Sequence, residues 1–241
     1  MRQTGFSFHG TPELLENMLE RHPEVDFVQL QINCLDWNHS TARASVCYET
    51  ARRHNKPVTV MGTLKGGLLA DVPVSVERMI EAVSGSGDPA AWALRFAASL
   101  EGVDYVLSGM ASLADVERNT AVMRDFRPFS PEEYAIVDEV ADTISAGTPV
   151  QCTACGYCIP ACPERISIPE LLRLYNSYSR MFGSGNYEAG YAALTEGRGS
   201  ASSCAGCRCC ESSCPQGLRI ADWMRRVAGV FEYGLATECV R

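Results

Sequence analysis

The chain has 241 residues, of which 46% are hydrophobic and 21% are charged, a composition typical of one large or two modest globular domains. A formal net charge of −8 argues against nucleic acid as a partner. No apolar run approaches the length of a transmembrane helix, and residues 1–10 carry no signal segment, so we expect no membrane partner.

Strand and helix patterns alternate through the first half of the chain. Residues 12–20 repeat apolar side chains at helical spacing behind Thr11, which is suited to cap a helix. Residues 27–35 are largely apolar, with Gln29 and Gln31 alternating onto one face, and predict a strand. Further helices are predicted at 45–55, 75–83, 89–100 and 112–126, and further strands at 58–64 and 104–109. This alternation is typical of an α/β region with a parallel sheet and crossover helices.

The composition changes near residues 126–131, and we predict a domain boundary there, between a first domain at 1–127 and a second at 128–241. Helices are predicted in the second domain at 131–146, 168–178, 187–194 and 220–233. We therefore expect a mostly helical domain in which two cysteine-rich segments lie between helices.

Eight of the twelve cysteines form two copies of the pattern C-x-x-C-x-x-C-x-x-x-C-P. The first copy comprises Cys152, Cys155, Cys158 and Cys162, and the second comprises Cys204, Cys207, Cys210 and Cys214. Each cysteine of the second copy follows its counterpart by 52 residues. This spacing is the ligand run of bacterial ferredoxins that carry two 4Fe–4S clusters. The motif therefore predicts two clusters and an electron-transfer function.

The fourth ligand of each cluster in such ferredoxins comes from the other motif. On that pattern one cluster takes Cys152, Cys155, Cys158 and Cys214, and the other takes Cys204, Cys207, Cys210 and Cys162. Gly156 and Gly206 would let backbone amides approach the cluster sulfides, because glycine has no Cβ.

Zinc and disulfides are the competing uses of these cysteines. A structural zinc site favours two separate C-x-x-C pairs over a run of four at three-residue steps, and a chain of this size needs no disulfide framework. Cluster-bearing thiolates imply a reducing compartment, so we expect a cytoplasmic protein. Cys34, Cys47 and Cys239 are expected to be buried or incidental thiols. Cys209, next to Cys210, is placed to interfere with cluster assembly.

Four stretches of the first half resemble the C-terminal half of an aldo/keto reductase barrel. They are GFSFHG at 5–10, FVQLQIN at 27–33, VMGTLKGGLL at 60–69 and VLSGMASLADVERN at 106–119, which resemble the fifth to eighth strand segments. The cysteine-rich half resembles the ferredoxin-like extension of one branch of that family, in CPERISIP at 162–169 and CPQGLRI at 214–220. The implied fold is the C-terminal half of a (β/α)8 TIM barrel followed by a mostly helical domain binding two 4Fe–4S clusters.

The resemblance also implies a nicotinamide coenzyme, NAD(H) or NADP(H), and assigns its contacts by position. Ser7 and Gln29 fall where the family hydrogen-bonds the nicotinamide carboxamide. Met61 falls where many members stack an aromatic ring on the nicotinamide. Leu64 and Lys65 lie in the loop that approaches the pyrophosphate.

The adenine end of the coenzyme is assigned in the same way. Asn119 matches a position that contacts the adenine. Gly109 and Asp115 stand where NADP-preferring members carry cations for the 2′-phosphate. Because a carboxylate beside a phosphate is unfavourable, the resemblance implies a preference for NAD.

The catalytic Tyr, Lys, Asp and His of the family belong to the first four strands of its barrel, and we find no counterpart for them in this sequence. We therefore assign no catalytic residue and leave enzymatic activity open. Four parallel strands cannot close a barrel, so two sheet edges and an inward apolar face would need a cover. A second copy, a separately encoded N-terminal half or the C-terminal helices could supply it.

Three functions follow from these features. The first is an oxidoreductase of the aldo/keto reductase type that passes electrons between a nicotinamide coenzyme and two 4Fe–4S clusters, incomplete without an N-terminal half. The second is an electron-transfer module without autonomous catalysis, which docks a redox partner. The third is a non-functional fragment, which should aggregate or melt without cooperativity.

Overall fold

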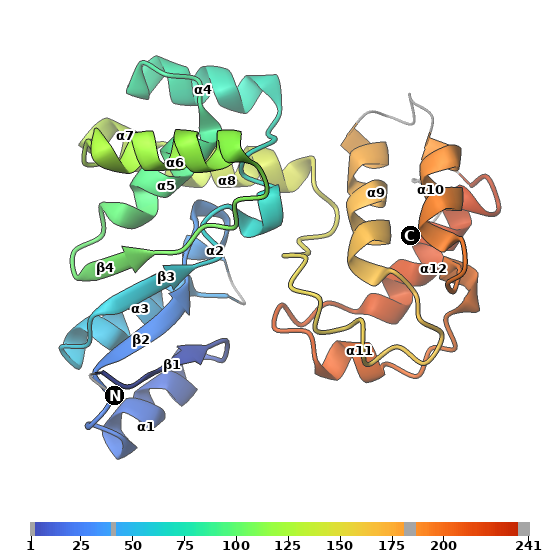
Figure 1. Cartoon of the computed structure of the whole chain (residues 1–241), viewed down its shortest axis with the longest axis horizontal. Coiled ribbons are helices and arrows are strands. Elements are labelled where there is room, and N and C mark those ends of the chain that lie inside the picture. The colour runs from blue at the N-terminus through green and yellow to red at the C-terminus, as the bar shows by residue number, and fades with distance from the viewer. Residues whose placement is uncertain (1–2, 40–41, 181–186, 236–241) are drawn as a thin grey trace. The chain divides into compact units, whose positions relative to one another are not determined.

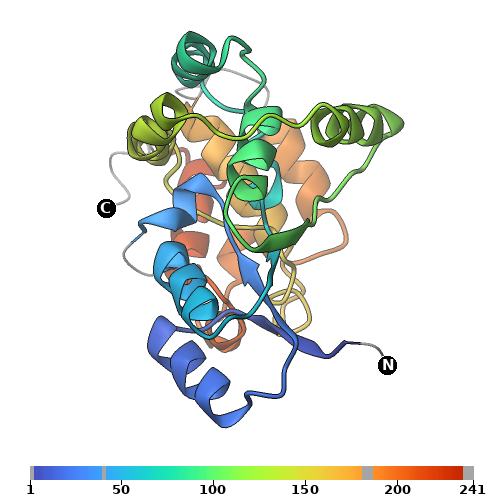
Figure 2. The ribbon, with the colours of Figure 1, turned by 90° about the vertical axis from the view of Figure 1, so that its left-hand side faces the viewer.

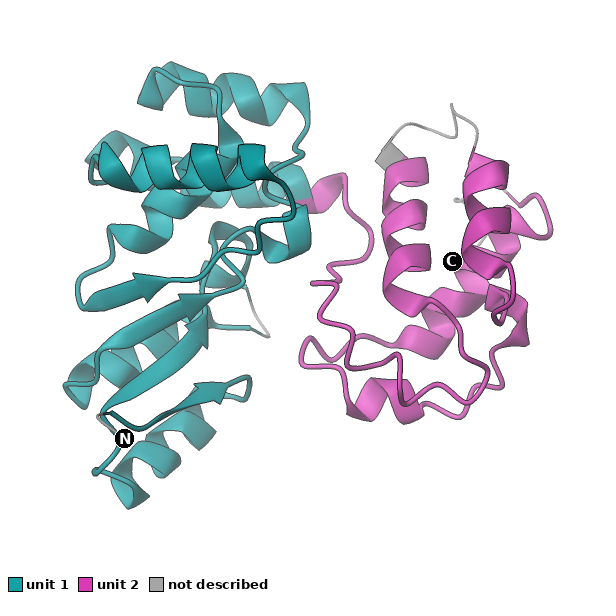
Figure 3. Cartoon of the chain, in the orientation of Figure 1, with its two compact units in different colours: residues 1–144 teal, residues 145–241 magenta. Residues whose placement is uncertain are grey.

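The computed structural model describes residues 3–39, 42–180 and 187–235, which belong to two compact units, Met1–Ile144 and Ser145–Arg241 (Figure 3). Cys239 lies outside the described residues. The units divide after Ile144, whereas the sequence placed a boundary between 127 and 128. The segment in between stays with the first unit because Phe129, Val137 and Val140 belong to its hydrophobic core.

Four parallel strands form the sheet of the first unit, in the order β1-β2-β3-β4 (Figure 1). They are β1 (Gly5–Phe8), β2 (Phe27–Gln31), β3 (Val58–Met61) and β4 (Val103–Val106). The parallel sheet predicted from the sequence is thus confirmed, but its strands are shorter. Beyond β2 the chain enters a short helix, α2 (Cys34–Trp37), because the Asn33 side chain caps it by accepting a hydrogen bond from the Asp36 amide.

Seven further helices of the first unit follow local signals in the sequence. They are α1 (Pro12–Arg21), α3 (Ala44–Arg53), α4 (Val74–Ser84), α5 (Pro89–Ala98), α6 (Leu113–Arg124), α7 (Pro131–Ala135) and α8 (Val137–Ala146), whose last residues pass into the second unit. The side chains of Thr11, Asp88, Ser112 and Ser130 cap α1, α5, α6 and α7. Helices α1 and α3 pack against each other (Figure 2).

One face of the sheet forms the centre of this core. Val28, Leu30, Val58 and Val60 are buried on it and pack in the same cluster as residues of α1, α3 and α5. Apolar burial at these positions is the main force that holds strands and helices together.

The opposite face carries Ser7, Gln29, Thr59 and Tyr105 side by side across the four strands. Ser7 is exposed, and Tyr105 is 64% exposed. We expected an apolar inward face, and this expectation is wrong, because three of the four residues in the row are polar.

Helices are the only regular secondary structure among the described residues of the second unit. Its longer helices are α9 (Ile168–Arg180), α10 (Tyr187–Thr195) and α12 (Ile220–Phe231), and its short ones are α11 (Cys209–Ser212) and a 3-10 turn at Ala201–Ser203. Helix α9 contacts both α10 and α12, and the core gathers Leu172, Tyr175, Met224 and Val227. No helix among the described residues has the length and apolar character to cross a membrane.

Candidate functional site

The two cysteine loops share one backbone path. In each loop, the residues two and four positions after the first cysteine have a left-handed backbone. They are Ala154 (φ 53°) and Gly156 (φ 80°) in the first loop, and Gly206 (φ 68°) and Arg208 (φ 58°) in the second. Left-handed backbone is unfavourable for residues with a Cβ, so its recurrence at matching steps indicates a shared structural demand. Gly156 and Gly206, singled out from the sequence, occupy non-matching steps, and each loop has one glycine and one other residue there.

The repeat continues past the last cysteine of each loop. The Cys162 amide donates to the Ile159 carbonyl at 3.2 Å, and the Cys214 amide donates to the Glu211 carbonyl at 3.1 Å. Helices α9 and α12 then begin at Ile168 and Ile220, which are again 52 residues apart. The second unit therefore contains two copies of a loop-and-helix element. Little besides the cysteines and prolines is identical between the copies, so the sequence alone revealed only the doubled motif.

The second motif forms a pocket with one cysteine of the first. Cys204, Cys207 and Cys210 line this pocket together with Cys162, the last cysteine of the first motif. Its apolar wall includes Ile166, Ile168, Ile220 and Met224. The set of four thiols is the crossed set expected for one cluster, inside a dry wall that would limit solvent access to it.

Cys214, the last cysteine of the second motif, lies near the first three cysteines of the first motif. Burial raises the pKa of the Cys158 thiol to about 12, and the neighbouring Cys152, Cys155 and Cys214 act in the same direction. Such mutual electrostatic effects require the four thiols to lie close together. The Ala154 amide donates to Cys152 Sγ at 3.4 Å, the kind of hydrogen bond to sulfur that cluster-binding loops provide.

The thiols of both sets must lose protons before they bind metal. Burial raises the pKa of Cys210 to about 11, with Cys204 and Cys162 acting in the same direction. The Cys158 and Cys210 thiols are therefore neutral in the metal-free protein at neutral pH, and loading with iron would release their protons.

The number and type of the donors suit clusters better than single ions. Among the residues that the structure describes, no three His, Cys, Asp or Glu side chains converge closely enough to hold one metal ion. A cubane cluster binds each thiolate through a different iron, so its four sulfurs stay farther apart than around one zinc ion. The two crossed sets of cysteines therefore fit two 4Fe–4S clusters.

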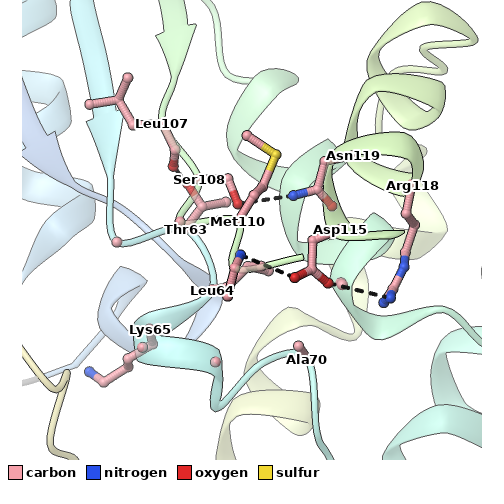
Figure 4. A pocket seen from close by; sticks show the side chains of 16 residues that line it. Thr63, Leu64, Lys65, Ala70, Leu107, Ser108, Met110, Asp115, Arg118 and Asn119 are labelled. Atoms are coloured by element: carbon pink, nitrogen blue, oxygen red, sulfur yellow. Dashed lines mark hydrogen bonds and ion pairs between the residues drawn. The ribbon is translucent and has the colours of Figure 1, made fainter. Parts of the chain in front are cut away.

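A second candidate site is a pocket of about 520 Å³ in the first unit (Figure 4). Residues 62–67 after β3, residues 107–111 after β4 and the first turns of α6 line it. Leu64, Lys65 and Asn119, which the resemblance assigned to the coenzyme, are among the lining residues. Asn119 Nδ2 donates to Ser108 Oγ at 3.1 Å, which fixes the amide at the pocket wall.

The Lys65 side chain is paired inside the protein. Its ammonium donates to the Asp36 carboxylate, and both side chains are 1% exposed. Gln31 Nε2 and Asn33 Nδ2 donate to the same carboxylate at 2.6 and 2.7 Å. In Figure 4 the Lys65 side chain points away from Asn119. Its charge is therefore neutralised by Asp36, so the loop that the resemblance assigns to the pyrophosphate carries no free ammonium at Lys65.

Asp36 was missed in the sequence, although a signal for it was present. It is an acidic residue in the otherwise apolar run Cys34–Trp37 that follows a buried strand. A buried carboxylate needs a partner, so such a residue predicts an ion pair but does not say with which cation.

Asp115 gives the pocket a negative charge beside the start of α6. It accepts hydrogen bonds from the amides of Ala111 and Ser112 at 3.2 and 3.0 Å. Hydrogen bonding to Ser112 is the main cause that lowers the pKa of Asp115. Arg118 lies 3.6 Å from it and also lines the pocket.

The remaining predicted coenzyme residues lie together on the sheet face opposite the hydrophobic core. Ser7 is the register partner of Gln29, and Gln29 Nε2 donates to Met61 Sδ at 3.2 Å. The structure thus divides the six predicted residues into two groups, Ser7, Gln29 and Met61 on the sheet, and Leu64, Lys65 and Asn119 around the pocket.

Comparison with known proteins assigns a family to each part of the chain. Residues 1–142 match the description "Aldo/keto reductase family". Residues 150–218 match the description "4Fe-4S dicluster domain". A search of the curated proteins finds no match.

Proposed function

Because the chain belongs to the aldo/keto reductase family and also carries a 4Fe–4S dicluster domain, we propose that it passes electrons between a nicotinamide coenzyme and two 4Fe–4S clusters. The observation that carries this proposal is the convergence of the eight motif cysteines into two crossed sets. Each cluster supplies one-electron chemistry when bound, and a nicotinamide hydride carries two electrons. Two clusters therefore match one coenzyme in electron count.

The coenzyme would bind at the carboxyl ends of the strands, where barrel folds place their chemistry. We propose that Ser7, Gln29 and Met61 hold the nicotinamide, that residues 64–65 approach the pyrophosphate, and that Asn119 contacts the adenine. The four strands would then correspond to half of a (β/α)8 barrel. No residue is proposed as a catalytic acid or base.

Charge favours NAD over NADP in this pocket. The Asp115 carboxylate lines it, and the two cations among its described lining residues, Lys65 and Arg118, are each paired with a carboxylate. A 2′-phosphate would lie beside the Asp115 carboxylate without an unpaired cation to bind it, whereas ribose hydroxyls could donate to Asp115. We expect Asp115→Asn to narrow the difference between NADH and NADPH affinities.

The pairing of Lys65 also favours the second candidate, an electron-transfer module without autonomous catalysis. With its ammonium held by Asp36, the loop offers a bound pyrophosphate its backbone and not a free charge. In that case the first unit would serve as a platform for a redox partner.

We propose that the free edges of the sheet are covered by a partner. Within the described residues β1 and β4 are unpaired on their outer edges, and an unpaired edge offers backbone hydrogen-bonding groups to another chain. The cover would be the other half of a barrel, a redox protein or a second copy, in the cytoplasm.

The proposal is tested by purifying the protein without oxygen, counting its iron, and adding NADH and NADPH separately while the visible absorbance of the clusters is followed. Bleaching by either coenzyme would support the oxidoreductase. Bleaching by dithionite but by neither coenzyme would leave the electron-transfer module. Asn119→Leu is a control, because it should weaken coenzyme-driven bleaching and leave dithionite-driven bleaching unchanged.

A further inference from the structure

The second loop-and-helix element carries arginines that the first element lacks. Residues 208–226 contain four arginines and two acidic residues, in a chain with a net charge of −8. At the matching positions 52 residues earlier, the first element has one arginine, Arg173, and otherwise Gly156, Ser167 and Leu174. Because the two elements repeat one backbone path, that path does not itself demand the additional positive charge.

Three of these arginines, which we call the arginine patch, gather around one carboxylate. The Arg208 guanidinium lies 3.8 Å from the Asp222 carboxylate, and the Arg219 guanidinium lies 2.5 Å from it. Arg225 donates to the same carboxylate. Glu211 lies 3.8 Å from Arg208, so two carboxylates face three arginines and positive charge is left over. The three arginine side chains are 54%, 72% and 75% exposed, so this charge is open to solvent.

The arginine patch adjoins the pocket of the second crossed set. Arg208 lines that pocket together with Cys207, and Ile220, which follows Arg219 in the chain, lines it as well. Helix α11, which begins just after Arg208, packs against α12, which begins just after Arg219 (Figure 1). Cys207 is exposed. A protein docked on the arginine patch would therefore lie against the loop that binds the second cluster.

Local stability does not explain why these residues are arginines. Arg219 is the N-cap residue of α12, where a positive side chain interacts unfavourably with the helix dipole. Arg208 has a left-handed backbone (φ 58°), which is unfavourable for a residue with a Cβ. The positive charge therefore costs stability at these two positions, which favours a role in binding.

We propose that the arginine patch is the docking surface for an acidic one-electron carrier protein that exchanges electrons with the second cluster. This inference rests on the proposed cluster function. The reduced cluster loses one electron and the redox centre of the carrier gains it, and no bond forms or breaks. Residues 1–144 contain 12 lysines and arginines and 21 aspartates and glutamates, so the first unit repels an acidic carrier. Electrostatic steering therefore favours an encounter at the arginine patch.

The inference is tested on the full chain, loaded anaerobically with iron and sulfide, reduced with dithionite and freed of the excess. The acidic haem protein cytochrome b5 and the basic haem protein cytochrome c serve as one-electron acceptors, and their visible absorbance reports the rate. Arg219→Gln with Arg225→Gln should lower the rate of cytochrome b5 reduction about tenfold at low salt, and the difference should shrink as salt is added. Reduction of cytochrome c should not slow.

The matched control is Arg78→Gln with Arg124→Gln, which removes the same charge from two exposed positions of the first unit. It should leave the rate of cytochrome b5 reduction nearly unchanged. Equal rates in the control and in the variant of the arginine patch would overturn the inference, as would a failure of the reduced clusters to reduce cytochrome b5.

Asp222→Asn changes the arginine patch in the opposite direction. It removes a negative charge from among the arginines and should therefore raise the rate of cytochrome b5 reduction at low salt. If the double arginine variant binds less iron than the unmodified protein, an unchanged rate in Asp222→Asn would overturn the inference. An unmodified protein that binds no clusters would contradict the proposed function itself, which is a separate result.

Discussion

The two units bury reactive groups in opposite ways. The first unit buries a charge together with its partner, since Lys65 and Asp36 neutralise each other and Gln31 and Asn33 complete the hydrogen bonds. The second unit groups thiols around a pocket, which Cys162 of the first motif lines together with three cysteines of the second motif. The difference teaches that the buried charge of the first unit is compensated by the unit's own side chains, whereas the grouped thiols of the second are donors suited to a bound metal group.

The largest expected effect concerns which cysteines share a cluster. Removing two ligands of one cluster should lose hardly more iron than removing one, whereas removing one ligand from each should affect both clusters. We expect Cys158→Ala with Cys214→Ala to resemble either single variant, and Cys210→Ala with Cys214→Ala to add their losses. Iron analysis after anaerobic loading measures this, and the reversed pattern would refute the crossed sets.

The next effect should be confined to the first unit. Asp36→Leu leaves the Lys65 ammonium buried without a partner and is expected to lower the free energy of unfolding by about 3–5 kcal/mol. Combining it with Lys65→Met should recover most of that loss, because neither charge remains. Urea denaturation measures both.

A surface pair provides the control for that experiment. Arg43 and Glu13 lie 2.7 Å apart and are both exposed, so Glu13→Gln should leave stability almost unchanged. If Asp36→Leu changed stability as little as Glu13→Gln, the buried pair would have no structural role.

A smaller effect depends on pH. Burial, aided by Asp36, raises the pKa of Cys34 to about 12 from an ordinary value of 9.0. The neutral thiol therefore stabilises the folded state fully below pH 9.0, and this contribution is lost as the pH rises toward about 12. Between pH 9 and 10 we expect a loss of about 1 kcal/mol, reduced in Cys34→Ala. Parallel pH profiles for both proteins would contradict the assignment.

The smallest effect compares the two loops directly. A Cβ added at Gly206 would meet no atom within 4 Å, so Gly206→Ala should destabilise the second unit only through its left-handed backbone, by about 1 kcal/mol. Ala154→Gly, at the matching step, should cause no comparable loss. Thermal unfolding of the iron-loaded variants measures the contrast, which would vanish if the loops did not share a backbone.

Local patterns predicted the elements well where the signal lay within a few residues. Thr11, Asp88 and Ser112 cap helices that the sequence placed correctly, and the parallel order of the sheet followed from alternation of strands and helices. The end of β2 was misjudged, because the Asn33 side chain starts a helix within an apolar run. The domain boundary differed because residues after 127 pack into the first core.

By itself the sequence determined the chemistry of the cysteines, since ligand type and spacing are local properties of the chain. Only the tertiary structure decided the neighbours that distant residues acquire. It places Cys162 in a pocket with cysteines of the second motif and pairs the Lys65 ammonium with the Asp36 carboxylate. It also places the Cys209 thiol next to the Cys207 carbonyl oxygen. The physical reason is that burial and electrostatic pairing depend on positions in space, which packing of the whole unit establishes.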